Sequence, residues 1–204
     1  MNAFSFLALG DSYTIGEGVA AAERWPLQLA SRLRREGIGC SDPRIVATTG
    51  WTTGELATAM DAETFAPRYA LVTLLIGVND QYRGRPLDEY REQFQTLLQR
   101  AIGLADGDAA RVIVVSIPDW GVTPFAAREG RDPARIAREI DAFNAAARAE
   151  AEAAGARWAD VTSLSRAPDL RNELVADGLH PSGKQYARWA TAILPVVRAA
   201  LKAA

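Results

Sequence analysis

The sequence is poor in the two residues that most often build redox and metal sites. Its 204 residues include one cysteine, Cys40, and one histidine, His180. A single cysteine closes no disulfide within the chain, so the fold does not depend on oxidation and Cys40 is expected to be a small, partly buried residue. One imidazole and one thiol form no transition-metal cluster, so we expect no metal and no cofactor. Any reaction that needs a histidine base has only His180 to use.

Long apolar runs and an excess of basic charge are also missing. No stretch approaches the roughly 18 apolar residues of a membrane span, and residues 1–9 lack the basic start of a secretion signal, so we expect a cytoplasmic protein. Lys and Arg number 23 and Asp and Glu 25, a formal charge of −2 that argues against nucleic-acid and membrane partners. With 49% apolar and 24% charged residues, the composition is typical of one globular domain over residues 1–204.

Short apolar runs alternate with longer amphipathic segments along the whole chain. Strands are expected at residues 4–9, 44–47, 69–76 and 111–117, with a weaker fifth strand at residues 156–160. The third and fourth runs are almost continuously apolar, as in the strands of a parallel sheet that is covered on both faces. This alternation predicts an α/β fold with right-handed crossovers, in which helices form a layer on each side of the sheet.

Helix signals lie between the predicted strands. Helices are expected at residues 25–36, 86–102, 132–155 and 182–201. Proline stands at or near the start of the second and third segments, glycine follows the first and ends the third, and Ser182 with Gln185 fits a capping box. Residues 119–131 and 162–176 show no such pattern and are expected to form surface loops.

Four polar motifs follow the predicted strands or precede the last helix. They are Gly-Asp-Ser at residues 10–12, Thr-Thr-Gly at residues 48–50, Gly-Val-Asn-Asp at residues 77–80 and Asp-Gly-Leu-His at residues 177–180. The carboxyl ends of parallel strands lie along one edge of a sheet, and the loops that follow them converge there. We therefore expect the four motifs to meet at one ligand site.

The residue types in these motifs fit acyl-transfer chemistry. Ser12 would attack a carbonyl carbon, and His180 would accept its proton and pass it to the leaving group. Asp177 lies three residues before His180 and would hold the imidazole in one tautomer. The backbone N–H groups of Ser12 and Gly50 and the side-chain amide of Asn79 would stabilise the oxyanion that forms.

Taken together, the four motifs resemble those of the SGNH (GDSL-type) hydrolases, a family of esterases, lipases, lysophospholipases, thioesterases and carbohydrate acetylesterases. The motifs span residues 10–180 in the family's order. The resemblance implies a flavodoxin-like three-layer α/β/α sandwich with a five-stranded parallel sheet. It also implies the triad Ser12, Asp177 and His180, with Gly50 and Asn79 as oxyanion donors. Tyr13 replaces the leucine of the family's name, at a position without a required chemical role.

Each of these residues also has a structural explanation. Ser12 could simply cap a helix, His180 could be a structural or surface residue, and Asn79 could be a turn residue. Gly54 competes with Gly50 because the sequence leaves the register of that loop open. The aspartates of the first and third motifs, at positions 11 and 80, are expected to tie loops to nearby backbone rather than to react.

Three other motifs are rejected. Residues 178–184 have the spacing of a P-loop, but Gln185 stands where that motif needs a Mg²⁺-binding Ser or Thr, and no clear strand precedes them. Residues 16–21 imitate a dinucleotide fingerprint but begin several residues after the strand has ended. The Gly-x-Ser-x-Gly elbow of α/β-hydrolases fails at Thr14.

The sequence thus predicts a serine esterase that acts on a small-molecule ester, with a monomer as the default state. Aromatic residues near the predicted site are candidates for a substrate pocket, above all Trp51, Tyr13 and Trp120, followed by Tyr82 and Phe125. Phospholipids, acyl-thioesters, aryl esters and acetylated sugars all remain open as substrates. The competing hypothesis is a non-catalytic module that binds a small molecule on the same fold, since fold alone does not specify function.

Overall fold

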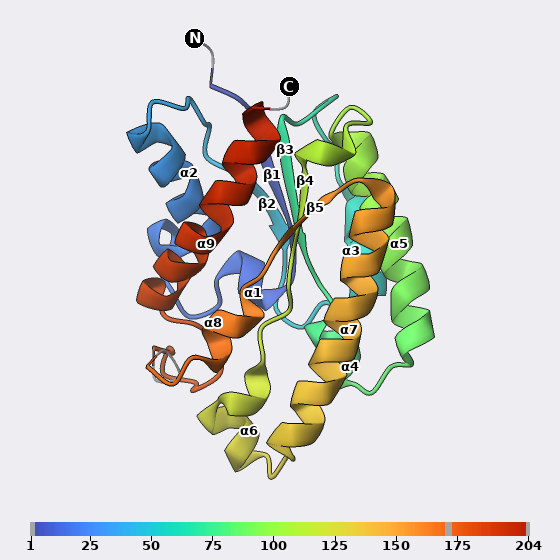
Figure 1. Cartoon of the computed structure of the whole chain (residues 1–204), viewed down its shortest axis with the longest axis vertical. Helices are drawn as coiled ribbons and strands as arrows, with labels where there is room; N and C mark the ends of the chain where they lie inside the picture. Colours follow the sequence, from blue (N-terminus) through green and yellow to red (C-terminus); the bar gives the residue numbers. More distant parts are fainter. Residues whose placement is uncertain (1–2, 170–172, 203–204) are drawn as a thin grey trace.

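The computed structural model describes residues 3–169 and 173–202, and at its centre is one five-stranded parallel sheet (Figure 1). The strands are β1 (Phe6–Gly10), β2 (Arg44–Ala47), β3 (Leu71–Leu75), β4 (Val112–Val115) and β5 (Arg157–Ala159). Their order across the sheet is β2-β1-β3-β4-β5, and every neighbouring pair is parallel. The α/β class and the five-stranded parallel sheet expected from the sequence are confirmed.

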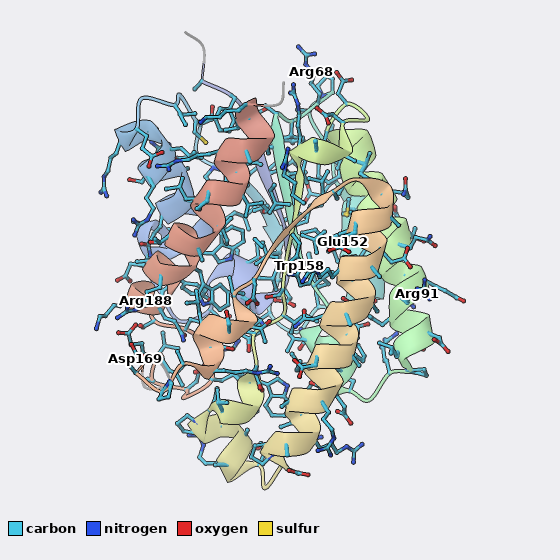
Figure 2. All side chains as sticks on the ribbon, in the orientation of Figure 1. Arg68, Arg91, Glu152, Trp158, Asp169 and Arg188 are labelled. Carbon is cyan, nitrogen blue, oxygen red and sulfur yellow. The ribbon has the colours of Figure 1, made fainter. Side chains whose placement is uncertain are left out.

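Helices cover both faces of the sheet. Helices α2 (Trp25–Arg35) and α9 (Gly183–Lys202) pack together on one face, whereas α3 (Thr53–Ala62), α5 (Leu87–Leu104) and α7 (Pro133–Ala154) cover the other (Figure 1). Strands β1, β3 and β4 are therefore buried along their whole length. This explains their nearly unbroken apolar sequences, because neither face of these strands meets water. Charged side chains such as Arg91 and Arg188 point outward from the helical layers (Figure 2).

Shorter helices connect the main elements. They are α1 (Ser12–Ile15), α4 (Val78–Tyr82), α6 (Pro124–Arg128) and α8 (Thr162–Arg166), with the 3₁₀ turns η1 (Ala21–Glu23), η2 (Ala109–Arg111) and η3 (Trp120–Val122). Helices α1 and α4 directly follow β1 and β3, and with α6 and α8 they gather in the lower half of Figure 1. The carboxyl ends of the strands point to this part of the molecule, where the polar motifs lie.

Two segments differ from the sequence-based expectation. Residues 119–131 and 162–176 were expected as loops, but they contain η3, α6 and α8; residues 170–172 of the second segment lie outside the described part. Thr123 caps α6 by accepting a hydrogen bond from the N–H of Ala126, and Pro124 occupies its first turn. Helix α3 was not expected at all, although Thr52 and Glu55 form a capping box at its start.

Two further observations bear on the expectations from composition. Cys40 is buried, and burial raises the pKa of its thiol to about 11. Across residues 3–169 and 173–202, no helix combines the length and apolar character needed to cross a membrane.

Candidate active site

Strand β1 delivers Ser12 to the edge of the sheet through a tight turn. A Cβ atom at Gly10 would lie 2.3 Å from Thr14 Oγ1 and 2.5 Å from the carbonyl oxygen of Leu75, so only glycine fits there. Asp11 caps helix α1, because its Oδ1 accepts a hydrogen bond from the N–H of Tyr13 at 3.0 Å. Ser12 is consequently the first residue of α1, and it is 5% exposed.

His180 is held by the carboxylate of Asp177. The ring Nδ1 lies 2.6 Å from Asp177 Oδ2, while Oδ1 accepts hydrogen bonds from the N–H groups of Leu179 at 2.7 Å and His180 at 3.0 Å. Partial burial raises the pKa of Asp177, but these hydrogen bonds, led by that from the His180 ring, outweigh burial and hold the pKa below its ordinary value. The arrangement leaves Nε2 as the ring nitrogen that Asp177 does not engage.

Neighbouring segments support the loop that carries this pair. The N–H of Val175 donates to the carbonyl of His180 at 2.9 Å, and the N–H of Phe125 donates to the carbonyl of Gly178 at 3.0 Å. A guanidinium N–H of Arg128 donates to the carbonyl oxygen of Asp177. Helix α6, through Phe125 and Arg128, and Val175 thus restrain the backbone of the loop that carries the imidazole.

The four sequence motifs meet around a pocket of about 180 Å³, here called the catalytic pocket. It is lined by Ser12, Tyr13, Thr49, Gly50, Val78, Asn79, Tyr82, Trp120, Phe125, Leu179 and His180. The nucleophile candidate and the histidine candidate, 168 positions apart in the chain, therefore face the same small space. Most of the remaining lining is aliphatic or aromatic.

Gly50, rather than Gly54, faces the catalytic pocket. Gly50 has a φ of +88°, a conformation that side chains with a Cβ atom rarely adopt. Its carbonyl oxygen accepts a hydrogen bond from the guanidinium of Arg83 at 2.7 Å, and Arg83 also pairs with Glu55. The sequence does not single out Arg83, because nothing in a lone arginine one turn after the third motif points to a backbone carbonyl on another loop.

Asn79 lies in the catalytic pocket with part of its hydrogen-bonding capacity already used. Its Nδ2 donates one hydrogen to the carbonyl oxygen of Trp51 at 2.9 Å, which orients the amide and leaves the second hydrogen. Trp51 itself differs from the expectation, since it is not among the residues that line the pocket. Its carbonyl serves Asn79, and its side chain is half-buried against the hydrophobic core. Tyr13 and Trp120, the other two pocket candidates, do line it.

The two remaining acidic residues of the motifs are buried beneath the site. Asp80 accepts hydrogen bonds from the N–H of Thr53 at 3.0 Å and from its hydroxyl at 2.7 Å, and so ties α4 to α3. Burial raises the pKa of Asp80 despite these donors. Asp11 is fully buried, and burial raises its pKa to about 8. The hydrogen bond from Tyr13 lowers the pKa and the nearby charge of Asp80 raises it, but burial is the largest effect.

A serine and a carboxylate-held imidazole line one pocket with amide groups at the carboxyl edge of a parallel sheet, an arrangement that fits acyl-transfer chemistry. The model of the GDSL-like lipase/acylhydrolase family matches residues 8–188, so the chain belongs to this family. The protein is accordingly a hydrolase that acts on ester bonds.

Solved structures with the same fold cover nearly the whole chain. TesA is 24% identical with a TM-score of 0.73, over 97% of this chain and 99% of that one. A lipase/acylhydrolase from Enterococcus faecalis is 19% identical with a TM-score of 0.73, over 97% and 96%. A variant of Axe2, an acetyl xylan esterase from Geobacillus stearothermophilus, is 20% identical with a TM-score of 0.72, over 96% and 95%. No curated protein sequence matches the chain significantly.

Proposed function

We propose that the protein is a serine esterase that cleaves carboxylic esters through an acyl-enzyme intermediate. In this proposal Ser12 is the nucleophile, His180 the general base and acid, and Asp177 the residue that orients the imidazole. The observation that carries it is that Ser12 and His180 both line the catalytic pocket, while Asp177 Oδ2 lies 2.6 Å from Nδ1 of the imidazole. Family membership supports an enzyme over a non-catalytic binding module, which is not favoured.

The reaction would run in two halves. Ser12 Oγ attacks the ester carbonyl carbon as its proton passes to Nε2 of His180, and the tetrahedral intermediate collapses when His180 protonates the departing alkoxide. A water molecule then attacks the acyl-enzyme with the same proton transfers, and the carboxylic acid leaves. No step needs a cofactor.

Three donors are available for the oxyanion of both intermediates. The N–H of Ser12 is the first of helix α1, so no carbonyl of that helix accepts it. The N–H of Gly50 and the second amide hydrogen of Asn79 complete the set, both from residues that line the catalytic pocket. Donors that are fixed before the reaction stabilise developing charge without reorganisation.

The decisive test is the Ser12→Ala variant. We expect its kcat on p-nitrophenyl acetate to fall by roughly 10³-fold or more, and covalent labelling by a diethyl phosphate ester, followed by mass spectrometry, to disappear. Ser163→Ala is the matched control, because Ser163 is exposed on helix α8 and its hydroxyl donates a hydrogen bond to Asp160. Labelling and turnover that persist in Ser12→Ala would overturn the proposal.

A further inference from the structure

Tyr82 stands between two hollows. It lines the catalytic pocket of about 180 Å³ and also a larger hollow of about 520 Å³, here called the outer hollow, which includes Leu87, Arg131, Ile136 and Phe143. The residue before it, at position 81, lines only the outer hollow. Helix α4 therefore supplies a partition with the reacting groups on one side and a roomier space on the other.

Aromatic contacts hold the ring of Tyr82 in place. The Trp120 ring meets it edge-on with 5.3 Å between centroids, and the Phe125 ring lies 6.4 Å away. On the side of the outer hollow, the guanidinium of Arg131 lies 5.0 Å from the centre of the ring. A ring that is packed against two others and a cation is a defined wall rather than a mobile side chain.

The second part of the partition is hydrogen-bonded. Trp120 Nε1 donates to Gln81 Oε1 at 2.7 Å, and Gln81 Nε2 donates to Glu139 Oε2 at 2.7 Å. Glu139 in turn accepts from Arg135 at 2.7 Å on helix α7. The indole that faces the catalytic pocket is thus anchored, through a buried glutamine, to a long helix of the fold.

The size of the catalytic pocket limits what it can hold. A protein cavity of about 150 Å³ accommodates one benzene molecule, so a space of about 180 Å³ suits a group of similar size. Its apolar lining comes from Val78, Tyr82, Trp120, Phe125 and Leu179. After the first half of the reaction the acyl group stays bound to Ser12 while the alcohol, protonated by His180, departs, so the acyl group is the part of the substrate that stays beside this half-open pocket.

We propose that Tyr82 determines specificity by closing the acyl pocket, so that the enzyme prefers short acyl groups of about two to four carbons. The inference depends on the proposed function, because it concerns the acyl group carried by Ser12. Removing the ring would join the catalytic pocket to the outer hollow, whose lining includes apolar side chains that an alkyl chain can contact.

The experiment measures kcat/KM for p-nitrophenyl acetate, butyrate and octanoate below their micellar concentrations. For the native protein we expect the octanoate value to be at least about 10-fold below the butyrate value, because a chain that is too long for an apolar pocket has to displace the side chains packed around it. In Tyr82→Ala we expect the ratio of octanoate to butyrate to rise by about 10-fold or more. Tyr82→Phe keeps the ring and should keep the native ratio.

Trp158→Ala is the matched aromatic control: Trp158, which is labelled in Figure 2, is half-buried on β5 and lines a different hollow. It should leave the ratio unchanged. Circular dichroism checks folding, and Tyr82→Leu replaces Tyr82→Ala if the smaller side chain prevents folding. Alkyl acetates from ethyl to octyl form the second arm of the experiment. The dependence of kcat/KM on the length of their alcohol should be the same in the native protein and in the variants at position 82.

Efficient turnover of octanoate by the native protein would overturn the inference, as would an unchanged ratio in a folded Tyr82→Ala. A response of the alcohol series alone would also overturn it, because the pocket would then hold the leaving group. Each of these results leaves the proposed function intact. By contrast, full activity of Ser12→Ala would remove both.

Discussion

The carboxylate of Asp177 grips His180 at two points, with Oδ2 2.6 Å from the ring Nδ1 and Oδ1 3.0 Å from the backbone N–H. Both contacts come from a residue three positions earlier in the chain, so the short loop of residues 177–180 orients the ring by itself. Gly178 has a φ of +70°, a conformation that lets the loop turn back on itself. An imidazole restrained at Nδ1 has its other nitrogen free for proton transfer.

The first prediction concerns the hydrogen bonds between Asp177 and His180. Asp177→Ala should lower kcat on p-nitrophenyl acetate by roughly 10²–10⁴-fold, because the imidazole loses its preferred tautomer and the charge that stabilises its protonated form. Steady-state kinetics provide the measurement. Asp169→Asn is the control, because Asp169 is an exposed acidic residue earlier in the same segment (Figure 2). This variant should keep native activity. An Asp177→Ala variant as active as that control would contradict the assignment.

The second prediction concerns the amide of Asn79. Asn79→Ala should reduce kcat by about 10²–10³-fold with a smaller change in KM, because an oxyanion donor acts mainly in the transition state. The same kinetics with p-nitrophenyl acetate decide the matter. If only KM changes, Asn79 binds the substrate in its ground state and has no role as an oxyanion donor.

Most of the sheet could be predicted from the sequence because its strands are buried on both faces. A run such as Leu71–Leu75 is almost entirely apolar and is bounded by clear turn signals, so the sequence marks it as a buried strand. Helix α3 could not be predicted because its sequence lacks such a clear pattern. It is short, its apolar residues form no strong stripe, and the capping box of Thr52 and Glu55 is its main local signal.

The polar motifs of the site could be located because each follows the end of a strand, where parallel-sheet topology brings loops together. The walls of the catalytic pocket could be predicted only in part: of the five aromatic candidates, Tyr13, Tyr82, Trp120 and Phe125 line it and Trp51 does not. Whether Trp51 faces that pocket depends on how its loop turns over the sheet, since Gly50 lines the pocket and the next residue does not. The partition at Tyr82 depends on Arg131 and Trp120, which reach it from a separate segment.

The third prediction concerns the buried link between α3 and α4. Thr53→Val removes the hydroxyl that donates to Asp80 at 2.7 Å and leaves a buried carboxylate with one donor fewer. The free energy of unfolding should fall by about 1–3 kcal/mol, measured by urea denaturation. Thr58→Val, on the exposed side of the same helix, should change it by less than about 0.5 kcal/mol. Equal effects of the two substitutions would refute the link.

The fourth prediction concerns the buried carboxyl group of Asp11. Burial raises its pKa from the ordinary 3.8 to about 8, so the folded protein keeps a proton there that the unfolded chain releases above pH 4. Since the folded state then binds more protons, the free energy of unfolding falls as the pH rises from about 4 to about 8. The contribution of this one group to that fall is at most about 1.4 kcal/mol per pH unit.

Asp11→Asn removes the titration while keeping an oxygen that can accept from the N–H of Tyr13. The variant should gain stability relative to the native protein between pH 5 and pH 8, by at least about 1 kcal/mol in urea denaturation. Asp169→Asn, whose carboxylate is exposed, should show no such gain. A difference between Asp11→Asn and the native protein that stays constant over this range would mean that Asp11 is ionised in the fold. In that case its Oδ2, which has no hydrogen-bond partner in the part of the chain that the structure describes, would have to find one.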